Sequence, residues 1–178
     1  MYTMIEEVIL VNDNDEEIST MEKIEAHKKG MLHRAFSIFI FNSKSELLIH
    51  KRAMGKYHSE GLWTNTCCSH PRPGEDLIKA ANRRLMEEMG LSCKLQPAFS
   101  FVYKIVFPSG LIEHELDHVI IGASEEKPVI NKNEVSEWKY ISLEELRKDT
   151  ENTPEKYTQW FMMCYEKAFA NFNDYKIK

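Results

Sequence analysis

Runs of apolar residues separated by short polar turns predict the strands of this chain. The segment 32–41 (LHRAFSIFIF) is rich in aromatic and β-branched residues, which is typical of a buried strand. The polar turn 42–45 that follows it predicts a hairpin with 46–52. Further strands are expected at 5–11, in one or two pieces between 93 and 107, at 111–123 and at 138–141.

Capping residues and helical periodicity predict helices at 20–29, at 74–90, from 142 to about 148 and from 153 onward. Two Ser-x-x-Glu sequences, beginning at Ser19 and at Ser142, have the spacing of a capping box. Glu75 and Asp76 are placed in the first turn of the second helix, where acidic residues suit the helix dipole. The last helix carries an apolar stripe formed by Tyr157, Trp160, Phe161, Cys164, Tyr165, Ala168, Phe169 and Phe172.

Three carboxylates, Glu113, Glu115 and Asp117, share one face of the predicted strand 111–123, because side chains alternate along a strand. If exposed, they would be uninformative. Because apolar sequence flanks them, we expect them to be at least half-buried, and buried carboxylates need a cation.

Composition and charge fit one soluble globular domain over residues 1–178. The chain is 43% hydrophobic and 29% charged, and its net charge is −5 with no long basic run, which argues against nucleic-acid binding. No segment approaches the roughly 18 apolar residues of a membrane span. The first residues lack the basic head of a signal peptide, and two of the four cysteines are adjacent, which does not suit a disulfide framework. We therefore expect a cytoplasmic protein.

The loop 63–73 concentrates reactive side chains, among them Asn65, Cys67, Cys68 and His70. One interpretation is a polar turn with a buried cysteine. The other is a reactive thiol beside a metal-binding histidine.

Imidazoles and carboxylates elsewhere could complete a metal site. His27, His33, His70, Glu113 and Glu115 together would suit Mn²⁺, Mg²⁺ or Zn²⁺, and the nitrogen ligands favour Mn²⁺ or Zn²⁺ over Mg²⁺. Taken alone, His27 has an ordinary interpretation as the partner of a helix C-terminus. These segments must also meet in space for the site to form.

The basic residues Lys51, Arg52 and Lys56 form either a solvated surface or a clamp for phosphate groups.

Part of the second predicted helix has the spacing of the Nudix signature. The matching positions are Glu75, Arg83, Leu85, Glu87, Glu88, Gly90 and Leu91. Ser69 stands at the first glycine, and Arg84 replaces a glutamate that helps Nudix hydrolases hold their metal. The resemblance implies an α/β (α+β) fold of the Nudix type, in which a mixed β-sheet is sandwiched between helices. The substitution at Arg84 argues against diphosphate hydrolysis.

The complete set of motifs resembles one family, the type 1 isopentenyl-diphosphate delta-isomerases. The resemblance rests on His27 with the segments 32–36, 63–71, 83–90 and 113–115. It implies interconversion of isopentenyl and dimethylallyl diphosphate in isoprenoid biosynthesis by protonation and deprotonation. A small-molecule diphosphate would be the substrate, and no protein partner is indicated.

The resemblance also implies a role for each site residue. Cys68 and Glu115 would exchange protons with the substrate, assisted by Tyr103. The metal ligands would be His27, His33, His70, Glu113 and Glu115, holding Mn²⁺ or Zn²⁺, while Glu88 would hold Mg²⁺ with the diphosphate. Substrate contacts would come from Lys23, Arg52, Lys56, Arg84 and Trp160.

Other interpretations remain open at this point. A Nudix diphosphate hydrolase would leave Cys68 and the three histidines without a role. A non-enzymatic zinc protein built on Cys67, Cys68 and His70 would require two adjacent cysteines to share one tetrahedral ion, which is awkward. By periodicity alone, Trp160 is best explained as a core residue.

Overall fold

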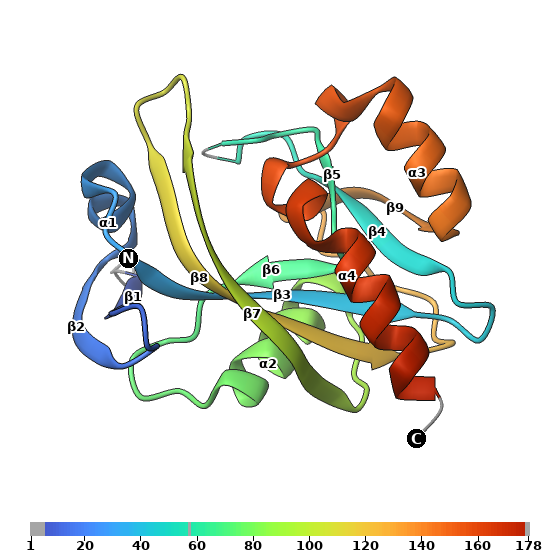
Figure 1. Cartoon of the computed structure of the whole chain (residues 1–178), viewed down its shortest axis with the longest axis horizontal. Helices are drawn as coiled ribbons and strands as arrows, with labels where there is room; N and C mark the ends of the chain where they lie inside the picture. Colours follow the sequence, from blue (N-terminus) through green and yellow to red (C-terminus); the bar gives the residue numbers. More distant parts are fainter. Residues whose placement is uncertain (1–5, 57, 177–178) are drawn as a thin grey trace.

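The structure is a computed structural model that describes residues 6–56 and 58–176 (Figure 1). Its strands are β1 (Glu7–Val11), β2 (Glu17–Glu22), β3 (His33–Phe41), β4 (Leu47–Arg52), β5 (Trp63–Thr64), β6 (Cys67–Ser69), β7 (Leu95–Val106), β8 (Ile112–Ala123) and β9 (Val135–Ile141). Its helices are α1 (Lys23–Lys29), α2 (Leu77–Met89), α3 (Leu143–Asn152), the 3₁₀ helix η1 (Pro154–Lys156) and α4 (Gln159–Lys176). Ile5, at the start of the first predicted strand, lies outside the described residues.

Strand β3 is the centre of the mixed sheet. It pairs antiparallel with β1, β4 and β6, and parallel with β8, whose other edge pairs with β7 in a long hairpin. Along β3, Phe36, Ile38 and Ile40 pack on the α2 side, while Phe39 and Phe41 pack against α4. Both faces are therefore covered, with α2 and α4 on opposite sides of the sheet (Figure 1). The predicted buried strand and the predicted sandwich are confirmed.

The predicted helix at 20–29 is wrong in its first part. Residues 17–22 form β2, which pairs antiparallel with β1, so Ser19 lies in a strand. Helix α1 begins only at Lys23, and the carboxylate of Glu22 caps it by accepting the N–H groups of Ile24 and Glu25 at 2.9 and 2.8 Å. The Ser-x-x-Glu spacing was present, but cross-strand hydrogen bonds along the hairpin override it.

Helix α2 begins at Leu77 rather than at Gly74. Asp76 is its N-cap and accepts the N–H of Lys79 at 3.0 Å, so neither Asp76 nor Glu75 lies in the first turn. Instead, the Glu75 carboxylate accepts hydrogen bonds from Nε and Nη2 of Arg83, each at 2.7 Å. Glu75 and Arg83, two positions of the Nudix signature, therefore form a bidentate ion pair that fixes the loop before α2 to the helix.

The remaining differences concern boundaries. The capping box of Ser142 and Glu145 is confirmed, but α3 continues to Asn152. The segment after Thr153 first forms the 3₁₀ helix η1, and α4 starts at Gln159, which leaves Tyr157 outside it. Strand β7 is one piece, β9 starts three residues earlier than predicted, at Val135, and the loop 63–73 contains the short strands β5 and β6.

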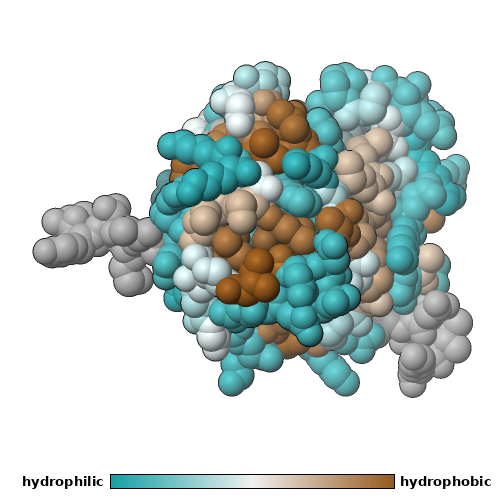
Figure 2. All heavy atoms as spheres, turned by 60° about the vertical axis from the view of Figure 1, so that its left-hand side comes forward, coloured by the Kyte–Doolittle hydropathy of each residue, from teal (hydrophilic) through white to brown (hydrophobic). Residues whose placement is uncertain are grey.

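Hydrophilic residues cover most of the face in Figure 2, and a group of apolar residues lies near its middle. In the part of the chain that the structure describes, no helix combines the length and the apolar character needed to cross a membrane.

Candidate active site

Strand pairing brings distant parts of the chain to one cavity. In the sheet, Glu115 on β8 lies beside His33 on β3 and Tyr103 on β7, while Cys68 on β6 lies beside Ser37 on β3. Of the predicted site residues, those that line the cavity are Lys23, Arg52, Lys56, Cys68, His70, Arg84, Glu88, Tyr103, Glu113, Glu115 and Trp160. His27 and His33 are fully buried next to it. The structure therefore gathers the whole predicted set in one place.

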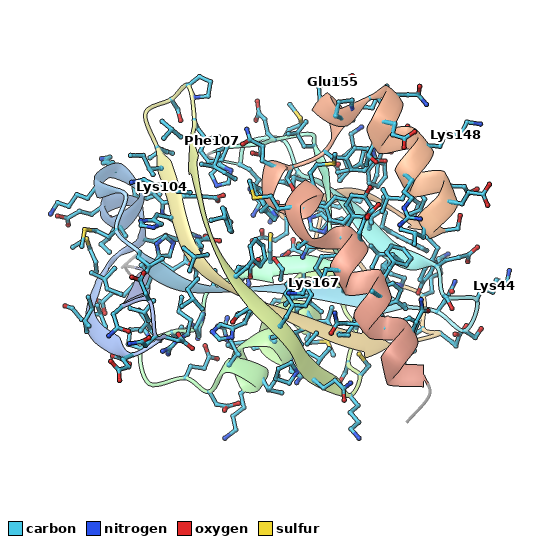
Figure 3. All side chains as sticks on the ribbon, in the orientation of Figure 1. Lys44, Lys104, Phe107, Lys148, Glu155 and Lys167 are labelled. Carbon is cyan, nitrogen blue, oxygen red and sulfur yellow. The ribbon has the colours of Figure 1, made fainter. Side chains whose placement is uncertain are left out.

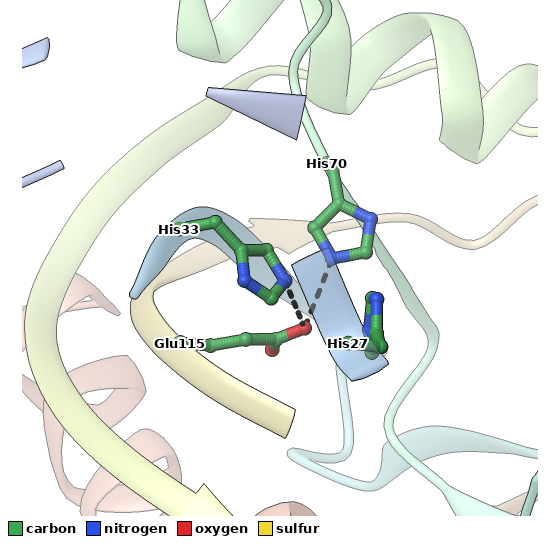
Figure 4. Close-up of side chains that lie close together, drawn as sticks. All are labelled: His27, His33, His70 and Glu115. Atoms are coloured by element: carbon green, nitrogen blue, oxygen red, sulfur yellow. Dashed lines mark hydrogen bonds and ion pairs between the residues drawn. The ribbon is translucent and has the colours of Figure 1, made fainter. Parts of the chain in front are cut away.

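Four residues in or next to this cavity form a compact cluster: His27, His33, His70 and Glu115 (Figure 4). One ligand atom from each lies within 4.8 Å of all the others. Nδ1 of His27 is 2.6 Å from the carbonyl oxygen of Lys23, and Nδ1 of His33 is 2.8 Å from that of Met31. A proton on Nδ1 satisfies each carbonyl and presents Nε2 as the ligand atom, which is the usual arrangement around metal-binding histidines.

The protonation states of the cluster suit a divalent cation. Burial lowers the pKa of His27, and it lowers the pKa of His70 to about 4, so both rings are neutral at pH 7. Although burial opposes its ionisation, hydrogen bonds from His33 and His70 hold the pKa of Glu115 well below its usual range. Burial also opposes ionisation of His33, but the hydrogen bond and the charge of Glu115 together raise the pKa of His33 instead. Imidazole nitrogens gathered around an ionised carboxylate are a donor set that fits a divalent cation.

Glu113 lies outside this four-residue cluster. Its Oε1 is 2.7 Å from Nε2 of His58, and its Oε2 accepts the hydroxyl of Tyr103 at 3.3 Å. Burial and the charge of Glu115 raise the pKa of Glu113 well above its usual range. Glu113 and Glu115 are therefore neighbours on one strand with different partners, and the role of Glu113 as a ligand stays a prediction.

Glu115 has a partner on each carboxylate oxygen. Oε1 is 2.9 Å from Nε2 of His70 and 3.4 Å from Nε2 of His33, and Oε2 accepts the hydroxyl of Tyr103 at 2.5 Å. Burial and the neighbouring carboxylates raise the pKa of Tyr103 well above its usual range, so its hydroxyl remains a donor. These contacts fix the orientation of the carboxylate.

The two adjacent cysteines have different surroundings. Cys67 is fully buried in the core beneath α2, where it packs with Phe36 and Leu85. Cys68 opens into the cavity, with Sγ 4.0 Å from Nη1 of Arg52. Because neighbouring side chains on a strand point to opposite faces, Cys67 and Cys68 cannot share one zinc ion with His70, which removes the zinc-protein interpretation.

The Cys68 thiol keeps its proton at neutral pH. Burial raises its pKa to about 12; Arg52 opposes this effect, whereas the carboxylates of Glu88, Glu113 and Glu115 reinforce it. The side chain is therefore a thiol rather than a thiolate in this environment.

A second group of cavity residues combines cations with carboxylates. Nη2 of Arg84 is 2.5 Å from Glu88 and 3.5 Å from Glu134, and Lys56 forms an ion pair with Glu134. Glu88 is only 4% exposed, and burial raises its pKa. Side chains of both signs at one buried place suit an anionic group accompanied by a divalent cation.

Trp160 belongs both to the core and to the cavity wall. It is 3% exposed and packs in the core beneath α4, and Cζ of Arg52 lies 5.3 Å from its ring centroid. Trp160 is therefore a core residue that also forms part of the cavity wall, and its contact with a substrate stays a prediction.

Sequence reasoning missed His58 and Glu134, which also line the cavity. His58 stood next to the basic residues without a pattern of its own, and Glu134 fell in the polar stretch before β9. Neither position belongs to a periodic element, so the contacts of these two residues with Glu113, Lys56 and Arg84 could only be seen in three dimensions.

Comparison with known proteins shows the family to which the chain belongs. A family model described as NUDIX domain matches residues 31–161. Isopentenyl-diphosphate Delta-isomerase 2 from Aromatoleum aromaticum is 51% identical over 167 residues, covering 94% of this chain and 88% of that protein. Isopentenyl-diphosphate Delta-isomerase from Pectobacterium atrosepticum is 52% identical over 169 residues, which cover 95% of this chain and 92% of that protein.

A solved structure supports the fold alone. The protein DR0079 from Deinococcus radiodurans superposes with a TM-score of 0.68 at 21% identity, covering 83% of this chain and 90% of that one. The relatives from Aromatoleum aromaticum and Pectobacterium atrosepticum match almost the whole chain, and both are named isopentenyl-diphosphate Delta-isomerase. By the family model and by its identity to these relatives, the chain belongs to the isopentenyl-diphosphate Delta-isomerases of the NUDIX family.

Proposed function

We propose that this chain interconverts isopentenyl and dimethylallyl diphosphate by a 1,3-allylic proton shift, with Cys68 and Glu115 as its acid–base pair. The observation that carries the assignment is that the Cys68 thiol and the Glu115 carboxylate line one cavity. Burial raises the pKa of the thiol, and hydrogen bonds from His33 and His70 lower the pKa of the carboxylate, which suits them to donate and accept a proton. The reaction adds a proton to an unactivated alkene and removes another from the allylic carbon. One residue of the pair donates the first proton to the alkene, and the other accepts the second proton from the allylic carbon. Their roles exchange in the reverse direction.

The cavity walls suit an intermediate with the character of a tertiary carbocation. Water would trap such a cation, so the site has to be closed to solvent while the proton moves. Trp160 offers an aromatic face, whose attraction for a desolvated cation is worth about 2 kcal/mol. Tyr103 holds the Glu115 carboxylate in a fixed orientation through its 2.5 Å hydrogen bond.

In our proposal, the diphosphate is held by four cations that line the cavity: Lys23, Arg52, Lys56 and Arg84. Glu88 would hold Mg²⁺ together with the diphosphate, and the histidine cluster with Glu115 would hold Mn²⁺ or Zn²⁺. When bound, these cations supply positive charge that offsets the diphosphate and the clustered carboxylates. Arg84 occupies the position at which NUDIX hydrolases place a metal-binding glutamate, so the residue that disfavours hydrolysis favours substrate binding. The four cysteines are free thiols, which suits the cytoplasm as the proposed location.

Incubation of the purified protein with isopentenyl diphosphate, Mg²⁺ and a trace of Mn²⁺ tests this function. We expect dimethylallyl diphosphate to form, with the diphosphate still attached to the product. Release of inorganic phosphate or diphosphate without an allylic product would instead identify a NUDIX hydrolase.

Replacing Trp160 by phenylalanine is expected to lower turnover more than stability. The smaller ring keeps much of the packing, whereas a tryptophan face binds cations better, so we expect turnover to fall about tenfold. The full truncation, Trp160→Ala, should lower turnover still further but should also cost about 3 kcal/mol of unfolding free energy, because the side chain is buried. Initial rates and urea unfolding of each variant measure the two effects.

Phe161 provides the matched control, because it is fully buried in the same core but does not line the cavity. Phe161→Leu should lose stability and keep its turnover while folded. Equal losses of turnover in Trp160→Phe and Phe161→Leu would reduce Trp160 to a core residue.

A further inference from the structure

His58 connects three parts of the cavity wall. It lies on the segment between β4 and β5, is 8% exposed, and stacks on Phe107 with ring centroids 4.5 Å apart and planes at 14°. Its ring meets Trp160 on α4 edge-on, with centroids 5.7 Å apart. Phe107 lies at the tip of the β7–β8 hairpin, on the side toward the β4–β5 connection (Figure 3).

The imidazole of His58 is held in one orientation. The stack on Phe107 fixes the ring plane. The carbonyl oxygen of His58 accepts a hydrogen bond from Nη2 of Arg52 at 3.2 Å, which fixes the backbone. Nδ1 lies 3.2 Å from the hydroxyl of Ser59, and Nε2 lies 2.7 Å from Oε1 of Glu113. When Nε2 carries the proton, Nδ1 can accept from Ser59, and the Nε2–H group lies within ion-pair distance of the Glu113 carboxylate.

His58 is next to the histidine cluster without belonging to it. The cluster consists of His27, His33, His70 and Glu115, and the His58 ring centroid is 6.5 Å from that of His27. Glu113 stands between His58 and Tyr103, with Oε1 on one and Oε2 on the other. A histidine that holds a carboxylate at the edge of a metal site has the geometry of an outer partner, which orients a ligand without touching the ion.

We infer that His58 is a positioning residue that orients the Glu113 carboxylate toward a divalent cation held by the histidine cluster and Glu115. The inference rests on the proposed metal site and deepens it, since it supplies the contact that places the fifth predicted ligand. A carboxylate in this buried setting needs a hydrogen-bond donor to keep one orientation. Without the Nε2–H group, Glu113 loses its 2.7 Å partner.

Two substitutions separate the hydrogen bond from the ring stack. His58→Gln can place an amide N–H near the position of Nε2 but removes the stack on Phe107, whereas His58→Phe keeps the stack and removes the donor. Titration of metal-free protein with Mn²⁺ by calorimetry gives the binding constant without reference to turnover. We expect His58→Phe to bind Mn²⁺ at least tenfold more weakly, the usual cost of losing an outer partner, and His58→Gln to stay within about threefold of the parent.

His118 supplies the control, because its Nε2 also pairs with a carboxylate, that of Asp15 at 3.0 Å, but outside the cavity. His118→Phe should bind Mn²⁺ like the parent. A Glu113→Gln background shows whether His58 acts through Glu113: adding His58→Phe to it should weaken Mn²⁺ binding no further.

Each result has one meaning. Parent-like Mn²⁺ binding by His58→Phe overturns the inference, and so does a variant series in which Gln binds as weakly as Phe, because packing rather than the donor would then matter. Failure of the parent protein itself to bind Mn²⁺ would instead remove the proposed metal site. Thermal unfolding of each variant confirms that the titrations are made on folded protein.

Discussion

Replacing Cys68 by alanine is expected to abolish turnover, with a loss of roughly 10³-fold or more, whereas Cys67→Ala should retain most of its activity. The thiol of Cys68 opens into the cavity with its proton in place, and alanine offers no group that can carry a proton. Cys67 faces the core beneath α2 and is fully buried, so it has no access to substrate. Initial rates of dimethylallyl diphosphate formation measure both variants.

The two substitutions should affect stability in the reverse order: Cys67→Ala is the one expected to lower the free energy of unfolding. Cys67→Ala leaves a small hole in a packed core and should lower the unfolding free energy by about 1 kcal/mol, while Cys68→Ala should change it little. The pair is therefore its own control, because each substitution removes the same atom. Full activity in Cys68→Ala, together with an inactive but folded Cys67→Ala, would move the catalytic thiol to the neighbouring position.

The parts of the fold that could be predicted are those in which local pattern and tertiary packing agree. The segment around Phe36 and Phe39 is apolar on both faces, and the sheet is covered on both sides at that point. One exception is Ser19, where a capping-box spacing occurs in a strand because pairing with β1 satisfies the same backbone groups. Capping signals are local, and they cannot show whether a neighbouring strand will compete for the chain.

The candidate site divides in the same way. Cys68, Glu115 and the three histidines could be named because residue type and spacing along the chain resemble a family. His58 could not, because its position follows from the way that one loop folds against Phe107 and Trp160. The different partners of the two strand carboxylates also could not be predicted, since alternation along β8 places Glu113 and Glu115 on the same face without showing what each will contact.

Changing Glu115 to glutamine is expected to remove turnover and to weaken Mn²⁺ binding together. Oε1 lies within reach of His70 and His33, and Oε2 accepts from Tyr103, so the carboxylate connects the metal cluster to the reacting cavity. The amide has nearly the same shape, but it lacks the negative charge that attracts a cation, and it cannot accept a proton from carbon. We expect at least a 10³-fold loss of turnover, and Mn²⁺ calorimetry should show the loss of affinity in parallel.

Metal removal from the parent protein separates the two roles of Glu115. A chelator should abolish turnover and lower the Tm, because an ion that binds only the folded state stabilises it, and added Mn²⁺ should restore both. In Glu115→Gln, saturating Mn²⁺ should restore the Tm in part while turnover stays absent, since the proton acceptor is missing. Glu137→Gln, on an exposed carboxylate that pairs with Lys51 at 2.9 Å, is the control and should behave like the parent in both assays. If saturating Mn²⁺ also restored turnover to Glu115→Gln, Glu115 would be only a metal ligand, and the second proton transfer would have to be assigned to another group in the cavity.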